Sequence, residues 1–284
     1  MGHEGFSAQK KFIKSFSGYV LTHKTVILEV PKITGKKMTK KCMVLLILMT
    51  LFGYGVADDH QNVREIHVCN FDDGSDLDDV LKAGDFFVKQ LKTLNLNNFD
   101  TFVWTPYRGS YAIDFLWLND YKDFLHNAAV DDVFYNSEEG AAAEARFAKI
   151  SKCQKSGYAY RKNLFPDNQP SGSGANKAVI ESFACHINPG WNDADIEDLD
   201  RHIQSTYADV EVYKNFLGFS TTPFIGQFDY DIYYYGVHDS VETLAKRDQF
   251  SIGSAQGQSL TRHWRKVLDC DRSLWWGQNI NRGG

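Results

Sequence analysis

Several common catalytic signatures are missing from this chain of 284 residues. It contains no His-Glu-x-x-His motif and no Gly-x-Ser-x-Gly motif, so zinc-protease and serine-hydrolase chemistry lack their usual residues. Its five cysteines include no closely spaced pair, which argues against a four-ligand metal site. The sequence therefore predicts no metal centre.

Basic residues are scarce outside the N-terminal segment. Residues 1–57 hold nine of the 31 Lys/Arg and only two of the 36 Asp/Glu, Glu4 and Glu29, so the remainder has a net charge of −12. A surface this acidic repels phosphate backbones and anionic lipids. We therefore expect no nucleic-acid partner.

The apolar stretch over residues 42–56 is too short for a helix that spans a bilayer, which needs about 20 residues. Basic residues precede it and small residues, Gly55 and Ala57, end it, as is typical of a secretory signal cleaved after Ala57. Residues 38–57 are therefore a predicted signal peptide, with no stable membrane insertion after cleavage and a secreted or periplasmic location. Residues 1–37 would be a non-native upstream extension, with translation starting at Met38; a long n-region is the alternative.

The rest of the chain reads as two copies of one domain. Thr105-Pro106 matches Thr222-Pro223 at an offset of 117 residues, and Cys153 matches Cys270 at the same offset. A period this long indicates duplication of a whole domain. We expect a first unit over 58–165, a linker over 166–177 that contains Pro170-Ser-Gly-Ser-Gly174, and a second unit over 178–284.

Both copies show one order of hydrophobic periodicities, strand-helix-strand-strand-helix-helix-strand. This is the split βαβ order with an added helix, and it predicts an α+β fold of two tandem ferredoxin-like (βαββαβ) units. The expected elements are 65–71, 76–94, 98–105, 111–118, 120–129, 138–152 and 157–164, then 180–187, 193–207, 215–222, 228–235, 240–248, 256–268 and 274–280.

The cysteines fit this topology. The first and last strands of such a unit are antiparallel neighbours, which brings Cys69 close to Cys153 and Cys185 close to Cys270. Four cysteines allow three pairings, and the duplication favours this one. Export supplies the oxidising compartment that disulfides need.

A tandem of such units, with Trp104-Thr-Pro106 and Ile113-Asp-Phe-Leu-Trp117 on its hairpin strands, resembles the dimeric α+β barrel superfamily, including its stress-responsive and antibiotic-biosynthesis-monooxygenase-like groups. The resemblance implies that both units of one chain pack into a pseudo-dimeric α+β barrel. Members include cofactor-free oxygenases, haem-handling enzymes, isomerases and proteins without known activity, so the fold does not select a function.

Asp114 and Asp231 are the predicted catalytic residues. They occupy equivalent places inside very apolar predicted strands, where burial would raise the pKa of a carboxyl toward general acid or base duty. A structural carboxylate bonded to the backbone or to a tyrosine is the alternative.

Aromatic and imidazole side chains supply a predicted ligand site. Planar or hydrophobic ligands favour pockets of this composition, although strands also carry aromatics as ordinary core. His186, at a strand end, could shuttle protons or serve only structure. The predicted ligand-binding residues are Trp104, Trp117, His186, Tyr233 and Tyr235.

These observations predict an exported protein that binds a small hydrophobic or aromatic molecule in an aromatic-lined barrel cavity. A cofactor-independent oxygenase or isomerase with an Asp base is one alternative. A structural or protein-interaction module that recruits partners through sheet edges is another. No cofactor is expected in any of these functions.

Overall fold

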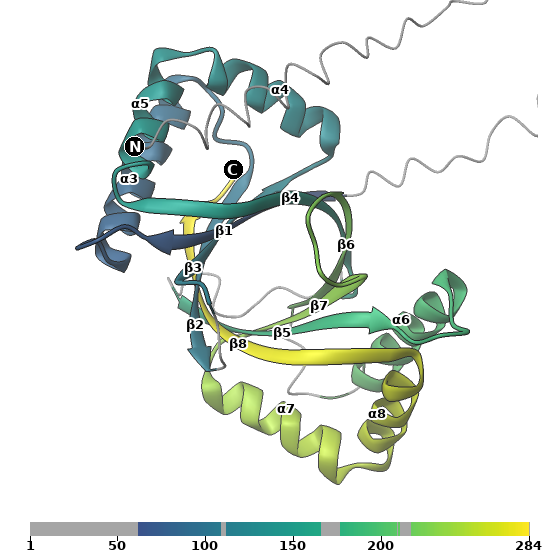
Figure 1. Ribbon diagram of the computed structural model, residues 1–284. Coiled ribbons are helices and arrows are strands. Elements are labelled where there is room, and N and C mark those ends of the chain that lie inside the picture. Colours follow the sequence, from purple (N-terminus) through teal and green to yellow (C-terminus); the bar gives the residue numbers. More distant parts are fainter. Residues whose placement is uncertain (1–61, 109–111, 166–176, 209, 211–216, 284) are drawn as a thin grey trace, which may run out of the picture. The chain divides into compact units, whose positions relative to one another are not determined.

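The computed structural model describes residues 62–108, 112–165, 177–208, 210 and 217–283. The predicted upstream extension and signal peptide lie outside the described residues, as does the predicted linker apart from Lys177, which begins a strand. Both copies have the predicted order of elements (Figure 1). The first copy comprises β1 (Asn62–Phe71), α3 (Leu77–Thr93), β2 (Asp100–Arg108), β3 (Phe115–Tyr121), α4 (Phe124–Tyr135), α5 (Glu138–Phe147) and β4 (Ser151–Asn163). The second comprises β5 (Lys177–Ile187), α6 (Asp193–Tyr207), β6 (Leu217–Gly226), β7 (Ile232–His238), α7 (Val241–Gly253), α8 (Ala255–Val267) and β8 (Leu268–Asn281).

The eight strands form one closed antiparallel barrel in the order β1-β3-β2-β8-β5-β7-β6-β4. Each copy contributes four neighbouring strands, and the copies join where β2 pairs with β8 and β4 pairs with β6. Closure leaves no free sheet edge in the barrel. The predicted antiparallel pairing of first and last strands is confirmed in both copies.

Two disulfides, Cys69–Cys153 and Cys185–Cys270, connect these first and last strands. In each case the bonded cysteines are directly opposite one another across the strand pair. The pairing predicted from the topology is therefore the one that the structure contains.

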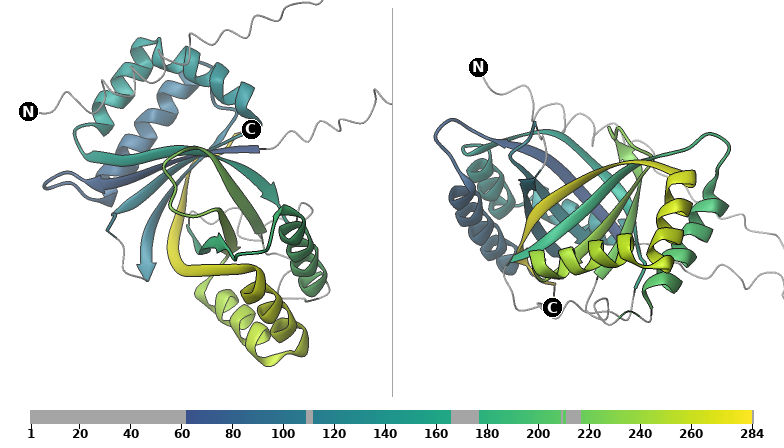
Figure 2. Two further views of the ribbon diagram at one scale, coloured as in Figure 1. Left: turned by 45° about the vertical axis from the view of Figure 1, so that its right-hand side comes forward. Right: turned by 90° about the horizontal axis from the view of Figure 1, so that it is seen from below.

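The helices cover the outer face of the barrel, with α3–α5 over the first copy and α6–α8 over the second (Figure 2). Strand residues therefore face either the helices or the barrel interior, alternately along each strand. The interior is filled by a buried cluster: Ile66, Trp104, Leu118, Ala159, Ile180, Phe219, Tyr235 and Trp275. Among the helices of the described ranges, none is long and apolar enough to cross a membrane.

The second hairpin strand of each copy begins four residues later than the periodicity predicts. β3 begins at Phe115 instead of residue 111, and β7 begins at Ile232 instead of residue 228. β3 then continues to Tyr121, so α4 begins only at Phe124, after its N-cap Asp123. The predicted boundaries were wrong because apolar residues on both sides of a turn extend the apparent strand.

Candidate ligand-binding cavity

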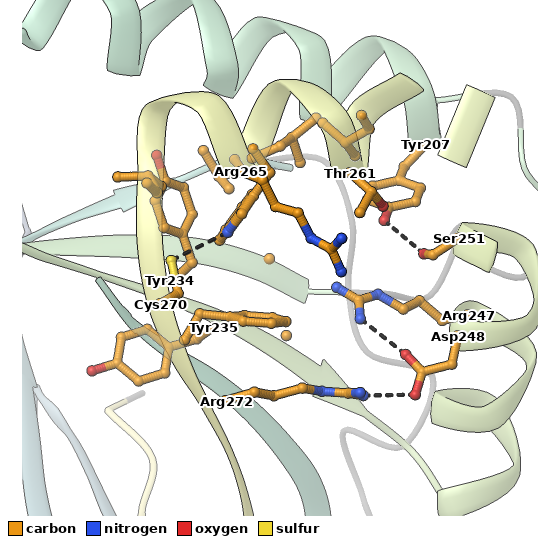
Figure 3. A pocket seen from close by; sticks show the side chains of 18 of the residues that line it. Tyr207, Tyr234, Tyr235, Arg247, Asp248, Ser251, Thr261, Arg265, Cys270 and Arg272 are labelled. Atoms are coloured by element: carbon orange, nitrogen blue, oxygen red, sulfur yellow. Dashed lines mark hydrogen bonds and ion pairs between the residues drawn. The ribbon is translucent and has the colours of Figure 1, made fainter. Parts of the chain in front are cut away.

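The second copy contains a partly open cavity between its sheet and its helices (Figure 3). Its volume is about 700 Å³, a size typical of small-molecule sites. Strands β5, β7 and β8 contribute one side, and α6, α7 and α8 contribute the other. The apolar lining includes Phe183, Ile203, Tyr234, Leu260, Trp264 and Leu268.

The duplication explains why this space is open. In the first copy, the equivalent space is packed with rings that contact one another edge to face: Phe87, Trp117, Phe134 and Phe147. Their counterparts in the second copy are Ile203, Tyr234, Ser251 and Trp264. The second copy thus lacks two of the four rings, and missing core atoms leave a cavity where the surroundings cannot collapse.

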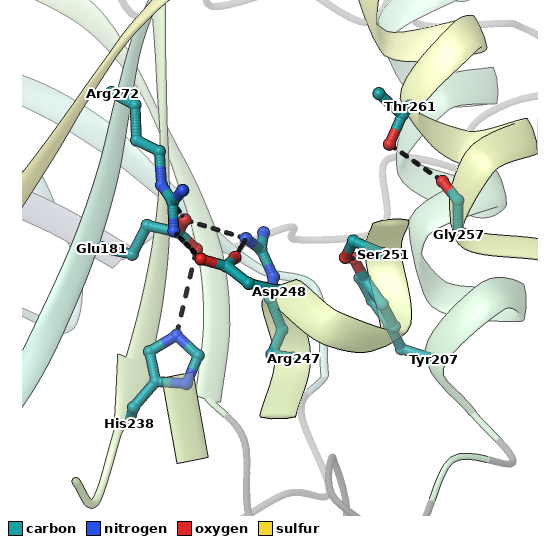
Figure 4. Close-up of polar contacts among 9 residues, drawn as sticks. All are labelled: Glu181, Tyr207, His238, Arg247, Asp248, Ser251, Gly257, Thr261 and Arg272. Atoms are coloured by element: carbon teal, nitrogen blue, oxygen red, sulfur yellow. Dashed lines mark hydrogen bonds and ion pairs between the residues drawn. The ribbon is translucent and has the colours of Figure 1, made fainter. Parts of the chain in front are cut away.

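Arg247 takes the place of the buried Val130 and brings charge to the cavity (Figure 4). Its Nη1 lies 2.8 Å from Glu181 Oε1 and 3.1 Å from Asp248 Oδ1. Arg272 contacts the same two acids, with its Nη2 2.6 Å from Asp248 Oδ2 and its Nε 2.5 Å from Glu181 Oε1. Two arginines and two carboxylates therefore form one network at the cavity wall.

Glu181 is the buried centre of this network, with no exposed side-chain surface. Burial alone would raise the pKa of its carboxyl, but Arg247, His238 and Arg272 outweigh burial and lower the pKa to about 2. His238 contributes from 3.9 Å, measured from its Nε2 to Glu181 Oε2. Glu181 is therefore ionised throughout the physiological pH range and holds the two arginines in position.

Arg265 contributes a third guanidinium to the lining, from α8. Figure 3 shows it pointing toward the guanidinium of Arg247. Within the parts of the chain that the structure describes, no carboxylate pairs with Arg265, in contrast to Arg247 and Arg272. The cavity thus combines apolar walls with one arginine that is available to a ligand anion.

The first copy carries a different polar cluster beneath α4. Asp131 and Glu65 share the hydroxyl of Tyr158, at 3.4 and 3.3 Å. His67 Nε2 lies 3.1 Å from Glu65 Oε1. Burial opposes ionisation of Glu65, yet His67 and Asn119 lower its pKa, whereas burial and the charge of Glu65 raise the pKa of Asp131 to about 8.

The structure places Asp114 and Asp231 just before β3 and β7, where both are exposed. The carboxylate of Asp114 accepts a hydrogen bond from the amide of Phe71, at 2.8 Å, and that of Asp231 accepts one from Ile187, at 2.9 Å. Their own amides donate to the carbonyls of the first cysteine of each disulfide. The expected burial inside a strand was therefore wrong, while their catalytic role remains a prediction.

Only Tyr235, among the five predicted ligand-binding residues, lines the cavity. Trp104 is buried in the barrel interior, and Tyr233 stacks there beside Tyr235. Trp117 belongs to the ring cluster of the first copy. His186 is exposed at the end of β5, with its Nδ1 3.5 Å from Asp231 Oδ2.

The sequence interpretation missed Arg247, Ser251 and Arg265. The duplicated sequence did hold a signal for two of them, since Arg247 aligns with Val130 and Ser251 with Phe134 at the offset of 117 residues. A core position that is apolar in one copy and polar in the other indicates that the two copies pack this region differently.

Comparison with known proteins supports the fold alone. No protein-family model and no curated protein matches this chain. Among solved structures, a candidate monooxygenase from Fusobacterium nucleatum has 10% sequence identity and a TM-score of 0.55, over 80% of this chain and 97% of that chain. A candidate monooxygenase from Lactobacillus acidophilus has 10% identity and a TM-score of 0.48, over 78% and 95%. A variant of chlorite dismutase from Candidatus Nitrospira defluvii has 10% identity and a TM-score of 0.47, over 78% and 93%.

The first of these matches, together with the closed barrel, shows that the chain has the dimeric α+β barrel fold. Both halves of the barrel come from one polypeptide. The predicted fold class is therefore confirmed.

Haem is a cofactor of some proteins with this fold, and the donor set of the cavity does not fit it. Iron in haem needs an axial His, Cys, Met or Tyr. Of the described residues that line the cavity, none is His or Met, and Cys270 is in a disulfide. The hydroxyl of Tyr234 donates to Asp200, and that of Tyr207 pairs with Ser251. The ring of Tyr235 packs against Trp104 and Phe219 in the barrel interior, away from the cavity. The described lining of the cavity therefore lacks an axial ligand for haem iron.

Proposed function

We propose that this protein is exported and binds a small organic anion with an apolar or aromatic body in the cavity of its second copy. The observation that carries the proposal is the pairing of apolar walls with Arg265, a guanidinium without a carboxylate partner among the described residues. Phe183, Leu260 and Trp264 would contact the ligand body, and Arg265 would pair with its carboxylate or sulfonate. The two disulfides support the proposed secreted or periplasmic location.

This proposal moves the ligand from the barrel interior, where the sequence predicted it, to the outer face of the sheet. The barrel interior is occupied by the buried rings of Trp104, Phe219, Tyr235 and Trp275. The space between sheet and helices is instead open in the second copy.

Binding of 1-anilinonaphthalene-8-sulfonate, an aromatic anion, tests the proposal by its fluorescence. Ser251→Phe restores the ring of the first copy, so we expect it to fill the cavity and weaken binding by about tenfold or more. Arg265→Gln removes the proposed anion partner, and we expect a loss of about tenfold. Arg262→Gln is the matched control, because Arg262 is exposed on the same helix and is not part of the lining.

N-phenyl-1-naphthylamine, which lacks the sulfonate, separates the two contributions. Ser251→Phe should weaken binding of both dyes, whereas Arg265→Gln should weaken only the anionic one. Thermal unfolding confirms that each variant is folded. Unchanged dye binding by a folded Ser251→Phe variant would place the ligand elsewhere.

A second candidate function is acid–base catalysis in the first copy, favoured by the raised pKa of Asp131. A carboxyl with a pKa of about 8, next to His67 and Glu65, is protonated at neutral pH and can donate a proton. The catalytic group of this second function would then be Asp131, acting as a general acid, rather than Asp114 or Asp231 acting as a base. A proton-transfer activity that survives in Asp131→Asn would contradict it.

A further inference from the structure

Two histidines of the second copy face each other across the contact between α6 and α8. His202 Nδ1 lies 2.9 Å from His263 Nδ1, although 61 positions separate them in the sequence. Both side chains are partly exposed and line a shallow hollow with Asp198, Arg201 and Ser205. The pair lies outside the described lining of the ligand cavity.

The first copy shows what this contact looks like without histidines. The residues at the equivalent positions are Phe86 on α3 and Arg146 on α5, and the Arg146 guanidinium carbon lies 5.0 Å from the centre of the Phe86 ring. That is a favourable cation–π contact between two helices. In the second copy two imidazoles take its place, and their contact alone stabilises the helix pair less than the cation–π contact does.

The side chains around the contact are also less positively charged in the second copy than in the first. Lys82 and Lys89 of the first copy align with Asp198 and Ser205 of the second. These two cationic side chains are replaced by an acid and a hydroxyl, while Asp85 of the first copy is replaced by Arg201, a cation that also lines the hollow. Because Asp198 pairs with Arg201, at 3.3 Å, the charged side chains of the hollow balance, and the net positive charge of the first copy, which would repel a metal ion, is absent.

Asp198 also lies where it can orient one imidazole. Its Oδ2 is 3.9 Å from His263 Nε2, on the ring edge opposite the nitrogen that faces His202. Histidines that bind a metal through one nitrogen commonly direct the other N–H to a carboxylate, which fixes the tautomer. At 3.9 Å the two atoms are not hydrogen-bonded, and Asp198 Oδ1 pairs with Arg201 Nη2 at 3.3 Å, so Asp198 would orient His263 only after a rotation of its side chain.

We propose that His202 and His263 form a binding site for a divalent transition metal, with zinc as its occupant, which links α6 to α8. Imidazole nitrogen is a preferred ligand of zinc, at about 2.0–2.1 Å. Two nitrogens 2.9 Å apart reach that distance with a small rotation of the rings. Within the described ranges no group of three His, Cys, Asp or Glu side chains is arranged for a metal, so water completes the coordination shell.

Binding requires no net loss of a proton from the neutral pair. With the two Nδ1 atoms in hydrogen-bond contact, one imidazole carries its proton on Nδ1 and the other on Nε2. In the zinc complex both Nδ1 atoms donate lone pairs to the metal, and the displaced proton is transferred to Nε2 of the same ring through water. Both rings remain neutral.

By linking α6 to α8, the bound metal would hold together two helices that line the ligand cavity. Ile203 follows His202 on α6, and Trp264 follows His263 on α8, and both of these neighbours line the cavity. Because the metal binds the folded arrangement and not the unfolded chain, it stabilises the fold by an amount that grows with the logarithm of the free zinc concentration above the Kd. The inference does not depend on what the cavity binds.

Zinc titration of the mature chain against a fluorescent zinc chelator tests the proposal, with Co²⁺ absorption as a second readout of nitrogen coordination. We expect one zinc per chain, a zinc-dependent rise in the thermal unfolding midpoint, and loss of about tenfold or more in affinity in His202→Gln or His263→Gln. His186→Gln is the matched control, an exposed histidine that also lies beside an Asp.

Circular dichroism establishes that the variants are folded before affinity is compared. Zinc affinity that is the same in wild type, His202→Gln and His263→Gln would overturn the proposal. So would a wild-type chain that takes up no stoichiometric zinc, an outcome that needs no variant.

Discussion

At the scale of single residues, the two copies use the same buried glutamate in opposite surroundings. Glu65 and Glu181 occupy equivalent positions on β1 and β5. Glu65 shares a tyrosine with the second carboxyl Asp131, whereas Glu181 contacts two arginines. The first arrangement retains a proton on Asp131 at neutral pH, and the second keeps its carboxylate ionised.

Asp131 gives a pH-dependent term in stability. Its folded-state pKa of about 8 exceeds its unfolded value of about 3.9, so between these values unfolding releases a proton and rising pH destabilises the fold. Asp131→Asn removes this term. As the pH rises through this window, we expect the wild type to lose up to about 1.4 kcal/mol of unfolding free energy per pH unit relative to the Asp131→Asn variant.

Urea unfolding between pH 4.5 and pH 8.5, with the disulfides intact, measures this difference. Asp132→Asn is the control, because Asp132 is the exposed neighbour on the same helix. Wild type and Asp131→Asn with parallel pH profiles would contradict the assignment.

At the scale of elements, both copies join their paired helices in one way. Ser137 caps α5 and Ser254 caps α8, and a glycine follows three residues later in each case, Gly140 and Gly257. A Cβ on Gly257 would lie 2.6 Å from the Ser251 Cα, and one on Gly140 would overlap the Phe134 carbonyl oxygen. Glycine is required because the helices meet backbone to backbone.

Gly257→Ala should therefore destabilise the protein by about 1–3 kcal/mol through overpacking against backbone that cannot move aside. Gly253→Ala is the matched control, since a Cβ there meets nothing within 4 Å. The control should be neutral or stabilise by up to about 1 kcal/mol, because alanine favours helix. Chemical denaturation of both variants measures the effects; equal stabilities would show that the helix contact is looser than described.

At the scale of the whole described chain, the barrel needs both copies. Each copy alone would expose its interior face, with Ile66, Trp104 and Leu118 in the first, and leave β2 and β4 as unpaired edges. Unpaired edges and exposed apolar faces favour association. The disulfides stabilise each copy internally, whereas the copies are held together by strand pairing and a shared core.

Residues 58–165 expressed alone, with the disulfide formed, should therefore self-associate or aggregate. An equimolar mixture with residues 178–284 should instead give a two-chain complex that restores the β2–β8 and β4–β6 pairings. Size-exclusion chromatography with light scattering distinguishes these species. A stable, monomeric first copy at micromolar concentration would contradict the shared-barrel account.

Prediction from sequence succeeded where the information is local or repeated. Hydrophobic periods predicted the element order, and the repeat linked Cys69 with Cys153 and Cys185 with Cys270. It failed at Asp114 and Asp231, since a short turn between apolar residues resembles the interior of a strand.

By itself, the sequence determined the duplication, the α+β order and the cysteine pairs, since each depends on periodicity or on a fixed offset along the chain. Only the tertiary structure decided that the barrel interior is filled and that the cavity lies under α6–α8. Strands with apolar residues on both faces do not reveal which face encloses a space. Whether a space stays open depends on the combined volume of side chains from elements far apart in the chain, and that sum exists only once they have packed together.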